Sequence, residues 1–297
     1  MRTPWIKPLA AGLLSVWLAC TAHAQALTGV LKKAHETGAV TIGYRDASIP
    51  FSYVSARGEP IGYAIDICRS LVDAIGEEIG RELLIKWQPV TSETRFNAVT
   101  SGQVDLECGS TTSNLERQKV VGFSPTTFVS GTKLMVKNGS PVKSFRDLVG
   151  KRVGVTAGTT NEKTLRELSD KFKLNLQLVV SRDHAESFAQ LASGKVDAFA
   201  TDDVLLYGLL AQNKAQADYA VVGEFLSYEP YGIMYRKGDA PLAEVVTKTF
   251  ATLAEDGDLS RFYTRWFLRR LPSGVSINLP MSPQLVTIFQ AMVVKPE

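Results

Sequence analysis

Cysteine and histidine are scarce in this sequence, which contains three of each among its 297 residues. With no cluster of such ligands, we expect no metal site and no cofactor. An excess of one charge is also missing, because 33 basic side chains face 30 acidic ones and the formal net charge is +3. Without a basic run to neutralise phosphates, nucleic acid is excluded as a partner.

A long apolar run is missing as well. The run from Leu9 to Ala19 is about half of the ~20 residues that cross a bilayer. It follows Arg2 and Lys7 and precedes Ala22-His23-Ala24, the pattern of a secretory signal peptide over residues 1–24. Removing it leaves 31 basic and 30 acidic side chains. Lipidation at Cys20 is a weaker alternative, because bulky Trp17 stands where a lipoprotein signal has a small aliphatic residue.

Beyond the signal, only Cys68 and Cys108 remain. In an oxidising compartment they can form one disulfide, and as two buried thiols they can equally act as small apolar side chains. The remaining chain of about 270 residues can build two domains with cores of their own, so a disulfide is not required for folding.

Short β-branched runs alternate with helical patterns, which predicts βαβ units and mainly parallel sheets. The expected strands are Val40–Ile42, Leu83–Val90, Val104–Glu107, Arg152–Val155, Leu176–Val180 and Val196–Ala200. Apolar residues at three- and four-residue steps between Ile61 and Ile79 predict a helix whose buried face belongs to the core.

A short motif indicates two related halves, because Ser101-Gly-Gln-Val-Asp105 is echoed by Ser193-Gly-Lys-Val-Asp197. In each, glycine ends a helix in the left-handed conformation before a strand. We expect the chain to cross between lobes near 128–133 and to return near 222–225. Lobe 1 would then hold residues 25–127 and 225–297, including helices at 242–255 and 259–267, and lobe 2 would hold residues 128–224.

Polar side chains follow the expected strands in both halves. Ligands of open α/β sheets bind beyond the carboxyl ends of the strands, so these positions are candidate contacts. They are Arg45, Ser92, Arg95, Ser110, Thr112, Arg117, Thr160, His184 and Asp202.

This set suits a small amino acid with two carboxylates. Guanidinium groups bind carboxylates through paired hydrogen bonds, and an aspartate binds an ammonium. Ala157–Thr160, ahead of a helix at 161–171, would add free N–H groups. A neutral ligand side chain would leave an arginine buried without a partner, which costs several kcal/mol.

Each candidate also has a simpler interpretation. Ser113-Asn-Leu-Glu116 has the pattern of a capping box that opens a helix, which would make Arg117 a solvated residue of the first turn. Asp202 could cap a helix at 203–212, and a lone histidine such as His184 is more often a cap or a surface residue. Convergence after several strands favours the binding interpretation.

Three stretches resemble a known family. They are Gly43-Tyr-Arg-Asp-Ala-Ser-Ile-Pro-Phe-Ser-Tyr53, Glu107-Cys-Gly-Ser-Thr-Thr-Ser-Asn-Leu-Glu-Arg-Gln-Lys119 and Asp183-His-Ala-Glu-Ser-Phe188. They are similar to periplasmic glutamate/aspartate-binding proteins of ABC transporters, with motifs in the same order from about residue 31 to 267. The resemblance implies a two-lobed periplasmic binding protein-like fold of type II, with two mainly parallel α/β sheets and a two-strand hinge.

The resemblance also implies roles for the candidate residues. Arg117 and Thr112, with Thr160 from the other lobe, would hold the α-carboxylate, while Asp202 and Ser110 would hold the ammonium. The side-chain carboxylate would be held by Arg45, Ser92, Arg95 and His184. The expected function is capture of L-glutamate or L-aspartate by hinge closure in the periplasm and delivery by a monomer to an ABC permease.

Three alternatives remain. An enzyme on this scaffold, similar to cyclohexadienyl dehydratase, is disfavoured because no supported nucleophile or metal cluster is present. A sensory module for the same ligand is not excluded by the sequence. A site for glutamine or a basic amino acid is disfavoured, because Arg45 and Arg95 would face a neutral or cationic side chain.

Overall fold

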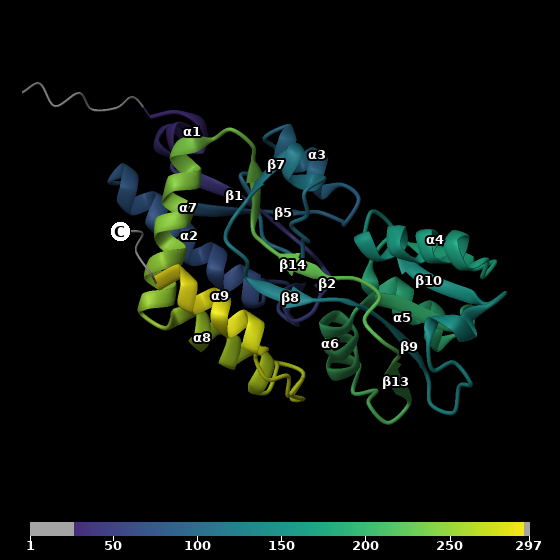
Figure 1. The fold of residues 1–297 in the computed structure, drawn as a ribbon. Coiled ribbons are helices and arrows are strands. Elements are labelled where there is room, and N and C mark those ends of the chain that lie inside the picture. Colours follow the sequence, from purple (N-terminus) through teal and green to yellow (C-terminus); the bar gives the residue numbers. More distant parts are fainter. Residues whose placement is uncertain (1–26, 294–297) are drawn as a thin grey trace, which may run out of the picture.

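The computed structural model describes residues 27–293, and the expected signal peptide and Cys20 lie outside this range. The chain forms two α/β lobes joined by a narrow middle (Figure 1). The first lobe contains α1 (Gly29–Thr37), β1 (Ala39–Tyr44), β2 (Ala47–Ser48), β3 (Ser52–Val54), β4 (Pro60–Ile61), α2 (Tyr63–Ile79), β5 (Leu84–Pro89), α3 (Arg95–Thr100), β6 (Leu106–Glu107), the 3₁₀ turn η1 (Arg117–Lys119) and β7 (Val121–Phe123).

After β8 (Phe128–Ser130) the chain enters the second lobe. This lobe contains β9 (Thr132–Lys137), η2 (Phe145–Leu148), β10 (Arg152–Thr156), α4 (Thr160–Phe172), β11 (Gln177–Ser181), α5 (His184–Ala192), β12 (Ala198–Asp202), α6 (Asp203–Asn213) and β13 (Tyr219–Val222). The chain returns through β14 (Glu229–Tyr231) to β15 (Met234–Arg236), α7 (Ala240–Glu255), α8 (Asp258–Tyr263), the π-helical turn η3 (Thr264–Leu268) and α9 (Pro283–Val293).

The two main sheets have equivalent strand orders, β5-β1-β6-β15-β7 and β11-β10-β12-β9-β13. In each sheet the first three strands pair in parallel, and the fourth pairs antiparallel with both of its neighbours. Four strands of each five therefore run in one direction, which confirms the prediction of mainly parallel sheets. The repeated order also matches the echo around Gly102 and Gly194, both of which have positive φ.

Strands β8 and β14 form a separate antiparallel pair between the two sheets and constitute the hinge. The return strand begins at Glu229, a few residues after the segment 222–225 where the sequence predicts the crossing. At Gly131, just after β8, a Cβ atom would collide with the carbonyl of Ser227 and the ring of Phe225. The connecting segments therefore approach each other closely.

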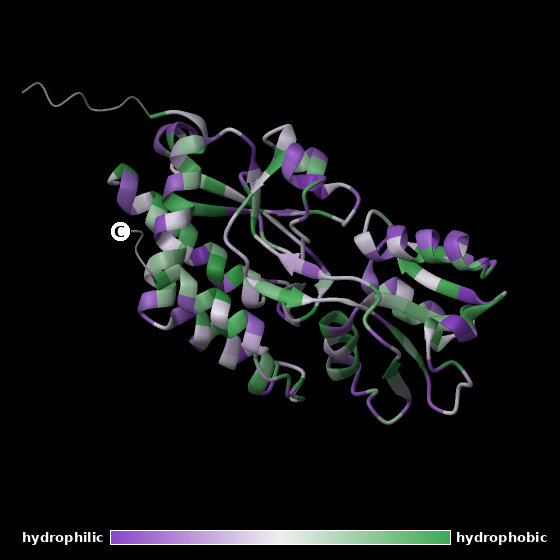
Figure 2. Ribbon diagram, viewed as in Figure 1, coloured by the Kyte–Doolittle hydropathy of each residue, from purple (hydrophilic) through white to green (hydrophobic). Residues whose placement is uncertain are grey.

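Apolar residues gather in the strands and on the inner helix faces, whereas α4 is largely hydrophilic (Figure 2). In α2 the predicted apolar stripe is buried, including Ile65, Cys68, Val72 and Ile75. At the hinge the rings of Phe51, Phe128 and Tyr231 form contacts with centroids 5.0–6.0 Å apart. The hinge is thus anchored in the aromatic core of the first lobe.

The C-terminal segment beyond Leu268, for which the sequence predicts nothing, folds back onto the first lobe. Helix α9 contacts α7 and hinge strand β8. Within residues 27–293, none of the helices is both long and apolar enough to cross a membrane.

Cys68 of α2 and Cys108, which follows β6, form a disulfide across 40 residues of sequence. Of the two interpretations left open by the sequence, the disulfide is confirmed. It ties the long core helix to the end of the strand that leads into the polar loop at 109–117.

Reduction should destabilise the protein, because a loop of this length restricts the unfolded chain by about 3–4 kcal/mol in the chain-entropy model. We expect urea unfolding in the presence of reductant to give a free energy of unfolding lower by about 2–4 kcal/mol. A Cys68→Ala/Cys108→Ala variant should have the same free energy of unfolding as the reduced protein, and reductant should not change it. An unchanged unfolding midpoint after verified reduction would contradict this expectation.

Candidate functional site

A small polar cavity lies between the two lobes. Seven of the nine candidate residues line it, namely Ser92, Arg95, Ser110, Thr112, Thr160, His184 and Asp202, together with Thr159, Asn161 and Leu205. The two remaining candidates, Arg45 and Arg117, do not line this cavity. Its volume is about 10 Å³, which is room for about one water molecule. An amino acid can therefore reach these side chains only if the lobes separate.

Several contacts hold the lobes together at the cleft. Arg117 Nη2 donates to the carbonyl of Gly158 at 3.3 Å, and Lys163 Nζ pairs with Glu116 at 2.7 Å. On the other side, a Cβ at Gly208 of α6 would collide with the carbonyl of Ile49. The structure thus represents a closed arrangement of the two lobes.

Arg95 begins α3, immediately after the loop that follows β5, and its side chain is buried. Its Nη1 donates to Thr111 Oγ1 at 2.7 Å, and that hydroxyl donates to Glu107 at 2.5 Å. The Nε of Arg95 has no hydrogen-bond partner among the described residues. Burial lowers the pKa of this guanidinium, while the nearby charge of Glu107 opposes the shift.

Arg45 follows β1 and is 2% exposed. Its Nη1 has no hydrogen-bond partner within residues 27–293. Burial, and then repulsion from Arg95, lower the pKa of Arg45 to about 10. Arg45 is therefore a buried, positively charged hydrogen-bond donor with at least one donor group unused.

Arg117 lies in η1, and the capping-box interpretation of the residues before it is wrong. Ser113 makes no capping bond; instead Asn114 Oδ1 accepts from the Arg117 backbone at 2.9 Å, and β7 begins after a single turn. The guanidinium donates to the carbonyl of Thr112 at 3.1 Å and lies over the Phe96 ring at 5.0 Å. Burial, and then repulsion from Arg95, lower its pKa to about 9.

The three guanidinium groups share one property. Within residues 27–293, no carboxylate oxygen lies within 4.0 Å of any of them, the distance that defines an ion pair. Buried guanidinium groups without carboxylate partners are costly, and a pair with a ligand carboxylate would compensate that cost.

His184 begins α5 and is buried, so the surface interpretation is wrong. Its Nδ1 lies 2.9 Å from Thr156 Oγ1. Burial, followed by the charges of Arg45 and Arg95, lowers the pKa of His184 well below its ordinary value. The imidazole is therefore neutral at pH 7 and can serve as a hydrogen-bond partner without adding charge.

Asp202 ends β12 and makes no side-chain cap to α6, so the capping interpretation is also wrong. Its carboxylate accepts from Asn161 Nδ2 at 2.6 Å and from the hydroxyl of Tyr231. Burial, and then the charge of Glu229, raise the pKa of Asp202 to about 7. A cation at this position would reverse part of that shift.

Three further polar residues at the site are not among the candidates expected from the sequence, namely Asn161, Glu229 and Tyr231. Asn161 lies in the first turn of α4, and its Nδ2 also donates to Thr132 Oγ1 at 2.7 Å. Glu229 and Tyr231 belong to the hinge strand, which the sequence places earlier in the chain. The proline and glycine in Glu-Pro-Tyr-Gly at 229–232 could have indicated a turn near the site. They could not have indicated the contacts that Glu229 and Tyr231 make.

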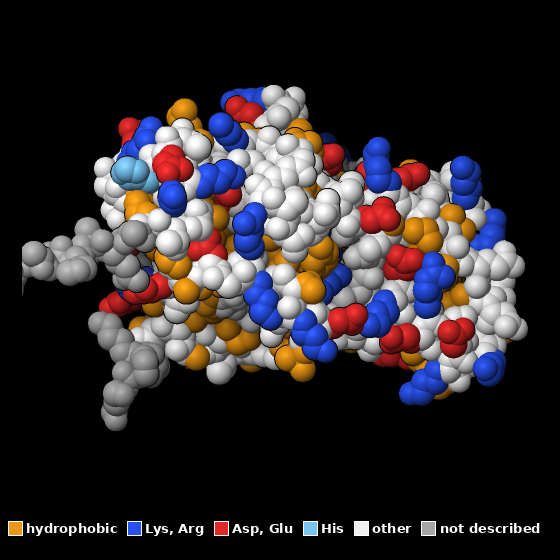
Figure 3. All heavy atoms as spheres, turned by 90° about the horizontal axis from the view of Figure 1, so that it is seen from above, with side chains coloured by type: hydrophobic (Ala, Val, Ile, Leu, Met, Phe, Trp, Pro, Cys, Tyr) orange, Lys and Arg blue, Asp and Glu red, His pale blue; other side chains and the backbone are white. Residues whose placement is uncertain are grey.

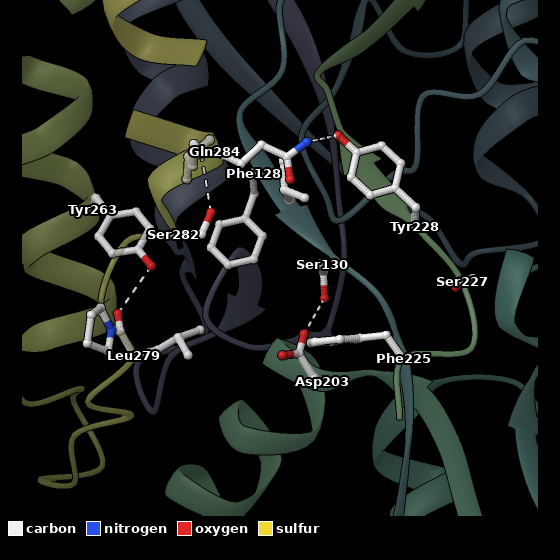
Figure 4. A pocket seen from close by; sticks show the side chains of 13 residues that line it. Phe128, Ser130, Asp203, Phe225, Ser227, Tyr228, Tyr263, Leu279, Ser282 and Gln284 are labelled. Atoms are coloured by element: carbon white, nitrogen blue, oxygen red, sulfur yellow. Dashed lines mark hydrogen bonds between the residues drawn. The ribbon is translucent and has the colours of Figure 1, made fainter. Parts of the chain in front are cut away.

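A larger cavity of about 530 Å³ lies apart from this cluster, between the hinge and the C-terminal segment (Figure 4). Phe128, Phe225, Tyr228 and Tyr263 contribute aromatic walls, and its carboxylate, Asp203, accepts from Ser130 at 2.6 Å. Because this cavity offers no arginine, its chemistry does not suit an acidic ligand. Size alone therefore does not identify the binding site.

No group of three potential metal ligands occurs in the part of the chain that the structure describes. Basic and acidic side chains are interspersed over the face shown in Figure 3. This face therefore lacks the one-sided basic surface typical of nucleic-acid binding.

Comparisons with known proteins agree with this architecture. The sequence matches the bacterial extracellular solute-binding proteins, family 3, over residues 40–269. An L-glutamate/L-aspartate-binding protein of Pseudomonas aeruginosa is 44% identical, with 93% of each chain covered. A glutamate/aspartate import solute-binding protein of Salmonella typhimurium is 37% identical, with 91% of each chain covered.

A solved structure of an ancestral arginine-binding protein bound to arginine superposes with a TM-score of 0.71 at 31% identity. The superposition covers 77% of the present chain and 98% of the arginine-binding protein. Both of these relatives are named as binding proteins. With a family match across most of its length and this shared two-lobed fold, the chain belongs to family 3 of the bacterial extracellular solute-binding proteins.

Proposed function

We propose that this protein binds L-glutamate or L-aspartate in the cleft between its lobes and delivers it to an ABC import permease. The observation that carries the proposal is a set of three guanidinium groups at the cleft, none of which forms an ion pair within residues 27–293. Arg45 and Arg95 are buried, Arg117 is half-buried, and buried Asp202 lies in the same cleft as Arg95. A ligand with two carboxylates and one ammonium complements this set. The names of the two curated relatives support the same ligands.

In this proposal each candidate side chain has a role. Arg117, Thr112 and Thr160 bind the α-carboxylate, and Asp202 with Ser110 binds the ammonium. The side-chain carboxylate is held by a group of four residues, Arg45, Ser92, Arg95 and His184. The buried hydroxyl of Ser92, which has no hydrogen-bond partner among the described residues, is available for such a bond.

Closure of the lobes would complete the site. Lobe 1 comprises residues 25–127 and 225–297, and lobe 2 comprises residues 128–224, with β8 and β14 as the hinge. Contacts from both lobes are satisfied together only in the closed arrangement, so ligand binding shifts the population toward it. The permease would recognise the closed form of a monomer, in the periplasm, after removal of residues 1–24.

A basic ligand fits this cleft less well, although a similar solved structure binds arginine. A cationic side chain would meet Arg45 and Arg95, both buried. Repulsion between buried like charges therefore disfavours a cationic side chain at this position.

Replacing the arginines tests the roles. Calorimetric titration should show glutamate or aspartate binding to the wild type, and Arg117→Ala should abolish binding of every amino acid. Arg95→Ala should weaken glutamate at least about tenfold more than glutamine, because only the acid loses a charged partner. The exposed Arg166, which pairs with Glu162, provides a control, and Arg166→Ala should bind normally. Equal losses for glutamate and glutamine in Arg95→Ala would refute its role.

Binding should also depend on pH through Asp202. Because its pKa is raised to about 7, the carboxyl is increasingly protonated below pH 7 and no longer neutralises an ammonium. The affinity for glutamate should therefore fall between pH 8 and pH 6. Below the pKa, this fall should approach about tenfold per pH unit.

Proton release gives the direct measurement. At pH 6, calorimetry in buffers of different ionisation enthalpy should detect close to one proton released per glutamate bound. Asp202→Asn should bind weakly and show neither the release nor the pH dependence. Identical affinities of the wild type at pH 6 and pH 8 would count against the assignment.

A further inference from the structure

Glu229 lies in hinge strand β14 and is 2% exposed. Its Oε2 accepts from Thr112 Oγ1 at 2.6 Å and from Thr160 Oγ1 at 2.7 Å. These two threonines stand on opposite sides of the cleft, before η1 and at the start of α4. One carboxylate of the hinge therefore bridges both sides of the site.

The hydrogen-bond donors to Glu229 are hydroxyl groups, although its charge also acts on Arg117 and Arg95 at longer range. Its Oε1 accepts from Ser227 at 2.6 Å, and Ser227 Oγ lies 2.7 Å from Thr132 Oγ1. Within residues 27–293, Glu229 forms no ion pair with a basic side chain. A buried carboxylate thus occupies the cleft in which an acidic ligand is proposed to bind.

The number of available hydroxyl protons limits how many acceptors these two threonines can serve. A threonine hydroxyl has a single proton to donate. In the structure the protons of Thr112 and Thr160 are both directed to Glu229. The same two hydroxyls are proposed donors to the α-carboxylate of the ligand, and they cannot serve both acceptors at once.

We propose that Glu229 is an internal competitor of the ligand, because its carboxylate competes with the α-carboxylate of the ligand for the hydroxyl groups of Thr112 and Thr160. This inference rests on the proposed glutamate/aspartate function and extends it to the hinge. Ligand entry requires the hinge carboxylate to release both hydroxyls, so Glu229 lowers the affinity for amino acids and links their binding to the hinge. Its charge also acts on Asp202, whose pKa it raises.

Glu229→Gln tests the competition, because the amide keeps the size of the side chain but is a weaker acceptor than a carboxylate. In calorimetric titration, L-glutamate should bind this variant at least about fivefold more tightly than the wild type. The matched control is Glu224→Gln, which removes the same charge from an exposed residue of the same connecting segment. The control should leave the Kd unchanged.

Isoglutamine, the α-carboxamide of glutamate, separates competition from a structural role. Because it has no α-carboxylate, its affinity should change less than that of glutamate in Glu229→Gln. If Glu229 only supports the fold, the variant should bind glutamate more weakly and unfold at a lower temperature. Unchanged or weaker glutamate binding, or an equal gain for isoglutamine, would overturn the proposal.

Glu229→Asp provides a second variant in case the amide impairs folding. Its shorter side chain reaches Thr112 and Thr160 less well, so it should also bind glutamate more tightly. Failure of the wild type to bind glutamate and aspartate would refute the proposed function itself. Binding by the wild type without a gain in either folded variant would refute only the role of Glu229.

Discussion

The enclosure of three guanidinium groups without carboxylate partners, two of them buried and that of Arg117 half-buried, is the constraint on which this structure depends. Arg45 and Arg95 each keep a nitrogen without a hydrogen bond among the described residues, and Arg117 is held by carbonyl oxygens and the Phe96 ring. Such an arrangement costs free energy in the isolated protein. It is sustained by the rest of the fold, and the proposed acidic ligand would compensate it by supplying the missing charges.

The fold creates this situation by bringing strand ends of two equivalent sheets against each other. Residues after β1, β5 and β6 face residues after β10, β11 and β12, and the hinge pair β8 and β14 keeps the two sets opposed. The hinge also contributes directly to the cleft. Tyr231 donates to Asp202, and Glu229 accepts from threonines on both sides. Opening of the lobes and the proposed recognition of the ligand therefore involve the same hydrogen bonds.

Much of this arrangement is predictable from the sequence, because the strands are short β-branched runs and ligand contacts follow strand ends. All six expected strands form, and Asp202, His184 and Arg95 line the small cavity between the lobes. Local sequence patterns gave wrong predictions where contacts with distant residues determine the local structure. The pattern Ser113–Glu116 resembles a capping box, but the chain turns into β7 after one turn. The short strands β2–β4 and the hinge position of Glu229 carry no strong periodic signal, since they are defined by pairing with distant residues.

A crystal structure of the protein with bound L-glutamate tests the central claim most directly. We predict one carboxylate of the ligand in contact with Arg117 and the other in contact with Arg45 and Arg95, and the ammonium in contact with Asp202. Glutamate bound elsewhere, or bound in the cleft with these guanidinium groups still lacking a carboxylate, would contradict the account.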